Sequence, residues 1–234
     1  MLSIAVLIPA LDEEAALPGV IGAIPAAGDG WAIREIVVVD NGSRDRTAEV
    51  ARAAGATLAR EPQRGYGAAC LAGLEYLHRA PPDVVAFLDG DHSDDPADLA
   101  NVLAPIAAGE ADLVVGSRVL GERERGALTP VQRFGNALAA VLIGALFGAR
   151  VTDLGPLRAI RWEALGRLRM RDRDYGWTVE MQTRAFRARL RYREVPVRYR
   201  RRRAGRSKVT GTLRGAAGAG AKILLTLARV RLGG

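Results

Sequence analysis

The sequence predicts an α/β fold in which a mainly parallel sheet is flanked by helices. Short, continuous apolar runs alternate along the chain with helical stretches, which is typical of strands covered on both faces. Hydrophobic residues make up 49% of the 234 residues, whereas aromatic residues make up only 5%. This composition supplies a substantial core, and small side chains allow helices to pack closely on a sheet.

Apolar runs of four or five residues mark the expected strands. The first covers residues 4–8 and is stopped by Pro9, which has no N–H to continue a ladder. Further strands are expected at residues 36–39, 56–59, 84–88, 113–116 and 192–199. Polar clusters directly follow the first, second, fourth and fifth runs. Parallel sheets bind ligands at the carboxyl ends of their strands, so we expect these clusters to meet at one edge.

Helical stretches fill the gaps between the expected strands. The acidic residues 12–14 suit the start of a first helix, because acidic side chains interact favourably with a helix N-terminus. Other helices are expected at residues 47–54, 67–78 and 134–149, around Glu180, and at residues 212–232. The first 200 residues contain no obvious linker. We therefore expect one domain at residues 1–210 and a C-terminal amphipathic helical segment at residues 211–234.

The net charge of +8 and the pI of about 10.4 favour anionic partners. Nucleotides, phosphates, anionic lipid and nucleic acid all belong to this class. The one cysteine, Cys70, excludes an internal disulfide and lies among small residues typical of a packed helix. These features are consistent with a reducing compartment.

The N-terminus lacks the basic region and long apolar run of a signal peptide. The longest apolar stretch, residues 134–149, contains Asn136 and falls short of the roughly 18 residues of a membrane span. It predicts a helix that is buried, lies at a membrane surface or joins two subunits of a homo-oligomer. We expect a cytoplasmic protein with peripheral contact at the inner face of an anionic membrane.

Asp89-Gly90-Asp91 carries the strongest chemical signal. The motif follows the run at residues 84–88, so both carboxylates lie where a buried strand enters a loop. Two close carboxylates repel each other unless a cation neutralises them. Hard oxygen ligands suit Mg²⁺ or Mn²⁺, which commonly bridge protein carboxylates and phosphates. His78 and His92 lack the spacing of a zinc site.

The polar clusters, taken in order, resemble the family 2 glycosyltransferases. The matching stretches are residues 8–14, 38–45, 89–91, 116–118, 152–158 and 206–209. Within that family the chain is most similar to polyprenyl-phosphate sugar synthases of the dolichyl-phosphate mannose synthase type. The resemblance implies the GT-A fold, a nucleotide-sugar donor and Mg²⁺ or Mn²⁺. It also implies inverting transfer of a sugar to a phosphate-bearing acceptor, with polyprenyl phosphate expected.

The same resemblance assigns roles to individual residues. Asp89 and Asp91 would hold the metal on the donor diphosphate, and together with Arg118 they are the expected catalytic residues. The expected substrate-binding residues are Pro9, Ala10, Glu13, Asp40, Gly67, Gly90, Arg118, Arg133, Asp153, Glu180, Arg202, Arg206, Ser207 and Lys208. The arginines and Lys208 suit phosphate contacts, and the stretch Arg206-Ser207-Lys208 suits a clamp on the acceptor phosphate.

Plainer interpretations stay open for several of these residues. Asp40 can form an Asx-turn, Glu13 can favour a helix start, and Gly67 can belong to an ordinary helix-start loop. Any single arginine can be a solvated surface residue.

Two alternative functions also stay open. The same fold could transfer sugar to a soluble hydroxyl, and Asp153 or Glu180 could then act as the general base. A nucleic-acid-binding module would suit the positive charge, but the chain lacks interleaved aromatic residues and a known binding motif.

Overall fold

The computed structural model describes residues 1–202, 225–227 and 229–231. The strands are β1 Leu2–Ala10, β2 Ala27–Gly28, β3 Trp31–Asp40, β4 Thr57–Arg60, β5 Val84–Phe87, β6 Leu113–Ser117, β7 Arg158–Arg161 and β8 Tyr192–Pro196. The helices are α1 Leu17–Gly22, α2 Thr47–Ala53, α3 Tyr66–Leu77, α4 Leu99–Ala107, α5 Pro130–Phe147, α6 Trp162–Leu168 and α7 Trp177–Arg187, with a short 3₁₀ turn, η1, at Pro96–Asp98.

All the described strands belong to one sheet in the order β2-β3-β1-β5-β7-β6-β8, and β4 also pairs with β3. β1 pairs in parallel with both β3 and β5, and β6 pairs in parallel with β8. β7 runs antiparallel to its neighbours β5 and β6. The predicted mainly parallel sheet is therefore confirmed, together with the six predicted strands. The alternating stretch 192–199 ends earlier than expected, at Pro196.

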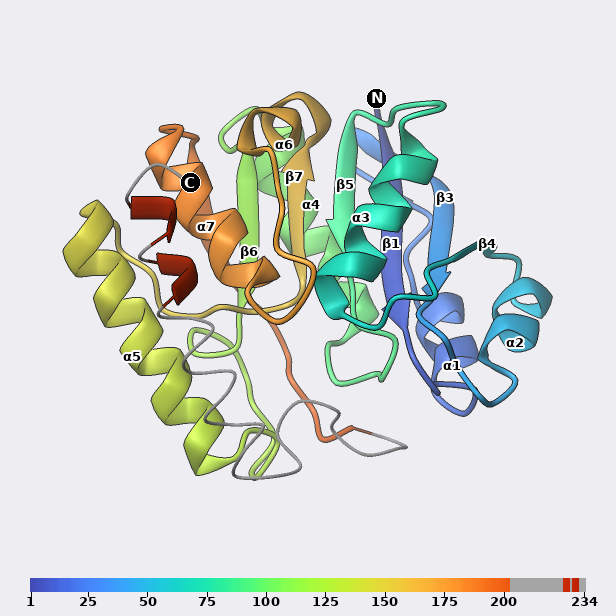
Figure 1. Ribbon diagram of the computed structural model, residues 1–234. Coiled ribbons are helices and arrows are strands. Elements are labelled where there is room, and N and C mark those ends of the chain that lie inside the picture. The colour runs from blue at the N-terminus through green and yellow to red at the C-terminus, as the bar shows by residue number, and fades with distance from the viewer. Residues whose placement is uncertain (203–224, 228, 232–234) are drawn as a thin grey trace.

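Helices cover both faces of the sheet, with α3, α6 and α7 on one side and α1, α2 and α4 on the other (Figure 1). The two-residue period of β1 serves both layers. Ile4, Val6 and Ile8 belong to the core under α1 and α4, while Ala5 and Leu7 belong to the core under α3. Because β1 is buried on both faces, a continuous apolar run is the sequence that fits it.

Two strands were not predicted, and β7 is the more important because it separates β5 from β6. Its sequence, Arg158 to Arg161, places two charged residues around Ala159 and Ile160. Arg158 is nevertheless fully buried. Arginine is strongly polar, so a pattern of apolar residues does not predict a buried strand at residues 158–161.

The first helix begins later than its acidic signal suggested. α1 starts at Leu17, and its first turn contains no acidic residue. The acidic residues instead meet the loop before α2. The backbone N–H of Glu13 donates to the Thr47 hydroxyl at 2.8 Å, and that of Glu14 donates to Asp45 at 3.1 Å. These bonds tie the carboxyl end of β1 to the segment that follows β3.

α5 stands at the edge of the molecule beside α7 (Figure 1). It begins at Pro130, four residues before the predicted start, because Thr129 and Gln132 form a capping box there. Only Ala139 and Ile143 of this helix are buried, so the expectation of a core helix is wrong. Among the described residues it is the one helix long and apolar enough to cross a membrane by length and composition.

The described part of the predicted C-terminal segment is helical at residues 225–227 and 229–231. These residues lie between α5 and α7 (Figure 1). Leu227 packs with Ile143 of α5 and Val179 of α7 in a small apolar cluster. One side of α5 is thereby covered, while its other side faces outward.

Candidate active site

A cavity of about 430 Å³ opens at the carboxyl ends of β1, β3 and β5. We call it the edge cavity. Its walls are Pro9, Ala10, Leu11, Asp12, Glu13, Asn41, Arg64, Gly65, Tyr66, Asp89, Gly90, Asp91, Tyr175 and Arg202. Seven of the predicted site residues thus meet here: Pro9, Ala10, Glu13, Asp89, Gly90, Asp91 and Arg202. The predicted convergence of polar clusters from successive strands is seen for β1, β3 and β5.

Asp89 lies just beyond β5 and presents a carboxylate that the protein leaves partly unsatisfied. Its Oδ1 atom is buried and has no hydrogen-bond partner among the described residues. Burial, and then the nearby Asp91 charge, raise the pKa of Asp89 to about 7. A hydrogen bond with Tyr66 and the charges of Arg202 and Arg118 oppose this rise. The site therefore favours a cation beside Asp89.

Asp91 is buried and has partners on both carboxylate oxygens. Its Oδ1 accepts the Ser93 backbone N–H at 2.8 Å, and its Oδ2 pairs with Nη2 of Arg202 at 2.7 Å. The other terminal nitrogen of Arg202 pairs with Glu13 at 2.9 Å. Arg202 thus neutralises two acids of the edge cavity, and a metal ion at Asp91 would take over part of that task.

Residues 198–202, which we call the arginine strap, cross the loops beyond β5 and β6. Arg198 pairs with Asp95 and Asp98, and Arg200 also pairs with Asp95. Arg201 pairs with Glu124. Each described arginine of the strap has an acidic partner, and the side chains of Arg198, Arg200 and Arg201 also remain partly exposed to solvent.

One end of the edge cavity is shaped by the turn after β3. Asp40 does not line the cavity; its Oδ1 accepts the Ser43 N–H at 2.9 Å in an Asx-turn. Asn41 lines it instead, donating to two backbone carbonyls at 2.8 and 2.9 Å and accepting the Gly65 N–H at 2.9 Å. Asn41 therefore joins the β3 edge to the loop before α3.

Gly67 also lies outside the cavity, in the first turn of α3. A Cβ atom there would come within 2.0 Å of the Asp172 carbonyl oxygen, and one at Gly65 within 2.2 Å of the Arg173 carbonyl oxygen. These glycines allow the start of α3 to pack closely on the loop before α7. The same loop brings Tyr175 to the cavity wall, a position that sequence spacing could not indicate.

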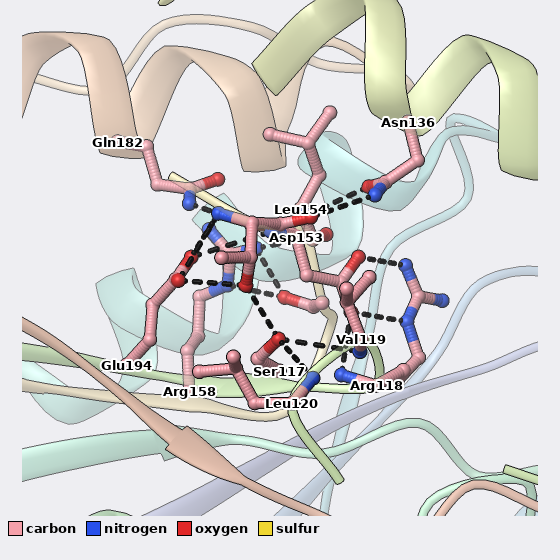
Figure 2. Close-up of polar contacts among 12 residues, drawn as sticks. Ser117, Arg118, Val119, Leu120, Asn136, Asp153, Leu154, Arg158, Gln182 and Glu194 are labelled. Atoms are coloured by element: carbon pink, nitrogen blue, oxygen red, sulfur yellow. Dashed lines mark hydrogen bonds and ion pairs between the residues drawn. The ribbon is translucent and has the colours of Figure 1, made fainter. Parts of the chain in front are cut away.

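Arg118 and Asp153 form a tight pair beside the edge cavity (Figure 2). Asp153 is completely buried, and its oxygens accept the Arg118 backbone N–H, Nε and Nη2, each at 2.7 Å. This pairing holds the pKa of Arg118 above its usual value despite burial. The guanidinium carbon also lies 4.9 Å from the centre of the Tyr199 ring. Its Nη1 has no hydrogen-bond partner among the described residues.

The Glu180 carboxylate is also fully engaged in hydrogen bonds, and Glu180 does not line the edge cavity. Its Oε2 accepts the backbone N–H groups of Arg171 and Asp172 at 3.0 and 2.8 Å, and its Oε1 accepts Nε of Arg184 at 2.9 Å. Glu180 therefore orders the loop that carries Tyr175. Neither Asp153 nor Glu180 presents an unoccupied carboxylate to a substrate.

The sequence between residues 5 and 210 matches the family described as Glycosyl transferase family 2. The chain belongs to this family. It is therefore a glycosyltransferase, and the matched residues contain the whole edge cavity. This family membership replaces the nucleic-acid-binding alternative with an enzyme.

Two relatives illustrate the family around this glycosyltransferase. An uncharacterised glycosyltransferase of Mycobacterium tuberculosis is 39% identical over 214 residues, covering 91% of this chain and 92% of the relative. A dolichyl-phosphate hexose transferase of Haloferax volcanii is 34% identical over 215 residues, covering 92% and 90%.

Solved structures confirm the GT-A architecture. Glucosyl-3-phosphoglycerate synthase of Mycobacterium tuberculosis aligns with a TM-score of 0.73 at 26% identity, over 98% of this chain and 80% of the synthase. That synthase was crystallised with Mn²⁺, UDP and glucosyl-3-phosphoglycerate. The expected fold class and the expected kind of metal ion agree with this neighbour.

A second cavity of about 440 Å³ lies between the turn after β6 and the start of α5. We call it the α5 cavity. Val119, Leu128 and Phe134 give it apolar walls, while Arg123 and Arg133 bring positive charge. Neither arginine has an ion-pair partner among the described residues. Arg133, predicted as a phosphate contact, is thus placed here and not at the edge cavity.

Three predicted residues, Arg206, Ser207 and Lys208, lie outside the described residues. Asp94, by contrast, had no predicted role. It is buried, both of its carboxylate oxygens lack hydrogen-bond partners among the described residues, and burial raises its pKa well above the usual value. Its sequence setting, beside the capping residue Asp95, resembles an ordinary helix start and gives no signal of this environment.

Proposed function

We propose that this glycosyltransferase moves a sugar from a nucleotide-sugar donor to polyprenyl phosphate, with inversion at the anomeric carbon. The proposal rests on one observation: the carboxylates of Asp153 and Glu180 are already occupied by hydrogen bonds and ion pairs within the protein. A hydroxyl acceptor needs a base to remove its proton, whereas a phosphate acceptor is already ionised. The two expected base candidates are both occupied, which favours a phosphate acceptor.

Asp89 and Asp91 fit the divalent metal that this reaction needs. Hard carboxylate oxygens suit Mg²⁺ or Mn²⁺, and the buried, unpartnered Oδ1 of Asp89 offers a ligand. The described residues contain no group of three or more His, Cys, Asp or Glu side chains arranged for a metal. Donor phosphates and water would therefore complete the shell. Once bound, the metal would neutralise charge that develops on the departing diphosphate.

The chain's own groups then have distinct tasks. An oxygen of the acceptor phosphate forms the new bond to the anomeric carbon, and the bond from that carbon to the donor diphosphate breaks. The electron pair leaves on the nucleoside diphosphate, so no proton has to move. Pro9, Ala10 and Glu13 line the donor pocket in this assignment. Arg202 and Arg118 both supply positive charge that acts on Asp89.

The α5 cavity suits the acceptor. A phosphate attached to an isoprenoid chain needs cationic groups beside an apolar wall, and Arg123, Arg133 and Phe134 supply both. The residues that line the cavity also include Thr152, which is next to Asp153 in the chain. The acceptor phosphate would approach Arg118 from this side.

Relatives support two different phosphate acceptors. The Haloferax relative is named for a dolichyl phosphate, whereas the structural neighbour is named for phosphoglycerate. The outward apolar face of α5 favours the lipid. A panel of UDP- and GDP-sugars with Mn²⁺ tests this against undecaprenyl phosphate, dolichyl phosphate, 3-phosphoglycerate and simple alcohols. Transfer to the polyprenyl phosphates is expected. Transfer only to phosphoglycerate or only to alcohols would overturn the lipid assignment.

We also propose that α5 rests on the membrane that holds the acceptor. Phe134 is 70% exposed and Val141 68% exposed, and Val131 and Leu138 continue the same stripe at helical spacing. Arg123, Arg125, Arg133 and Arg150 flank the stripe and suit anionic headgroups.

Vesicle sedimentation tests this contact. Binding should rise with the anionic lipid fraction, fall with salt, and fall in Phe134→Asp. Dimerisation through α5 without sedimentation at low salt would replace the membrane with a second subunit.

A further inference from the structure

The loop at residues 152–155 is held by side chains from four different elements (Figure 2). It has no regular secondary structure, so its backbone groups need other hydrogen-bond partners. β8 contributes Glu194, α5 contributes Asn136, α7 contributes Gln182 and β7 contributes Arg158. An irregular buried loop with this many dedicated partners is fixed in one conformation, which is costly unless its shape matters.

Glu194 takes the N–H groups at the start of the loop. Its oxygens both lie 3.0 Å from the Thr152 backbone nitrogen, and Oε1 lies 3.3 Å from the nitrogen of Asp153. Its Oε2 also accepts the Thr152 hydroxyl at 2.7 Å. Hydrogen bonds to a charged acceptor are roughly twice as strong as neutral ones, so Glu194 holds the start of the loop firmly.

The other three anchors act mainly on the carbonyl groups. Asn136 and Gln182 donate to the first two carbonyls, and the buried Arg158 donates to the last two. The bonds are Asn136 Nδ2 to Thr152 O at 3.1 Å, Gln182 Nε2 to Asp153 O at 3.0 Å, Arg158 Nη2 to Leu154 O at 3.2 Å, and Arg158 Nε to Gly155 O at 3.1 Å. Asn136 also accepts the Leu154 N–H at 2.9 Å.

Two routes lead from Glu194 to Arg118. In the first, the fixed Asp153 carboxylate binds the backbone N–H, Nε and Nη2 of Arg118 and so sets the direction of its free Nη1. In the second, the Thr152 hydroxyl lies 2.6 Å from the Ser117 hydroxyl. The Ser117 oxygen in turn accepts two N–H groups of the turn that follows Arg118, at 3.1 and 3.2 Å.

We propose that Glu194 is a positioning residue for sugar transfer, acting through the 152–155 loop to aim Arg118 at the acceptor phosphate. The proposal rests on the assignment of Arg118 to that phosphate. Glu194 itself lines neither cavity. Its loss should therefore leave donor binding intact and change only how well the acceptor is held.

Three variants test this with donor and acceptor kinetics. Glu194→Ala should raise the KM for polyprenyl phosphate on the order of tenfold, since small misplacements of positioning groups have large effects. Glu194→Gln keeps one oxygen acceptor and should restore most of the loss. Tyr192→Phe is the matched control, because it removes the hydroxyl that donates to Glu194 at 2.8 Å and accepts from Gln182 at 2.9 Å, but removes no direct contact with the loop. The donor KM and far-UV circular dichroism should be unchanged in all three.

An NMR readout separates this proposal from the proposed function. The buried Nε–H of Arg118 should give a sharp, slowly exchanging signal, assigned by its loss in Arg118→Lys. It should broaden or vanish in Glu194→Ala and persist in Tyr192→Phe. An unchanged signal in Glu194→Ala would overturn the positioning role. If the signal is lost but Glu194→Ala and Arg118→Lys both keep a normal acceptor KM, positioning holds and the acceptor assignment of Arg118 fails.

Discussion

Aspartates at the two ends of the sheet differ in hydrogen bonding and in the direction of their pKa shifts. At the amino ends of the parallel strands, Asp83 precedes β5 and accepts the backbone and hydroxyl groups of Ser3 at 2.7 and 2.8 Å. Asp112 precedes β6 and binds the Arg191 side chain at 2.6 and 3.1 Å. These hydrogen bonds lower the pKa of both aspartates. Both groups are stable as anions without any ligand.

At the carboxyl ends, the pKa of Asp89 is raised to about 7 and that of Asp94 is raised well above the usual value, in each case mainly by burial. Oxygens of both residues lack hydrogen-bond partners among the described residues. The protein thus stabilises Asp83 and Asp112 at one edge and leaves Asp89 and Asp94 poorly compensated at the other. Buried carboxylates with raised pKa values are expected where a cation or a substrate binds and supplies the missing interactions.

The largest expected effect comes from removing a carboxylate at the poorly compensated edge. Asp91→Ala should lower turnover by on the order of 100-fold or more, because the metal's stabilisation of the leaving group is worth several kcal/mol. Steady-state assays with Mn²⁺ measure the loss, and circular dichroism checks the fold. Turnover within a few-fold of wild type would show that this edge does not serve a metal.

The second-largest effect is expected from removing Arg202, which pairs with Asp91 and Glu13. Arg202→Met should weaken nucleoside diphosphate binding about tenfold, the size expected for one charge-assisted contact. Arg201→Met is the matched control, since within residues 1–202 the Arg201 side chain pairs with Glu124 and donates to the Arg125 carbonyl, away from the edge cavity walls. Calorimetry with Mn²⁺ present distinguishes the two. An equal loss in both variants would mean that general positive charge, not Arg202 itself, attracts the nucleotide.

The comparison also predicts substitutions of opposite sign. Asp94→Asn removes a buried acid whose carboxylate oxygens have no hydrogen-bond partner in the described part of the chain, so it should stabilise the unliganded fold by about 1 kcal/mol. Thermal unfolding at pH 7 measures the change. A clear fall in Tm would reveal that Asp94 is compensated in solution and would weaken the contrast between the two edges.

The smallest effect is expected at the opposite edge. Asp83→Asn should cost less than about 1 kcal/mol at neutral pH, because the residue is exposed. The folded-state pKa of Asp83 lies below its unfolded value, so its stabilisation is present above the unfolded pKa. It is lost as pH falls through the folded pKa. Wild type and variant should therefore converge in acid. A difference that persists at low pH would point to packing instead of charge.

The sequence predicted the parallel pairing of β3, β1 and β5 because each of these strands contains a continuous apolar run. It also predicted Asp89 and Asp91, because they directly follow such a run. It did not predict the use of Asp153 as a fixed partner of Arg118, 35 positions away. That pairing depends on β7 entering the sheet with a buried arginine, and neither hydropathy nor spacing signals this event.

The site shows the same division at single residues. Pro9, Ala10 and Glu13 reach the edge cavity because they end β1, a strand visible in the sequence. Gly67 and Asp40 were close in sequence to cavity residues but serve packing and a turn. Tyr175 and Arg202 reach the edge cavity from loops that are distant in the sequence. Of these two, only Arg202 was predicted, because its charge suits a phosphate contact.

We infer that the acids at the carboxyl edge of the sheet bind the nucleotide donor together with a metal ion. Isothermal titration calorimetry of UDP and GDP against the protein tests it most directly, once with Mn²⁺ and once with EDTA. The account predicts clear binding of at least one nucleotide with Mn²⁺ and a loss of tenfold or more in EDTA, on the order expected for one strong charge interaction. Equal affinity under both conditions would contradict it.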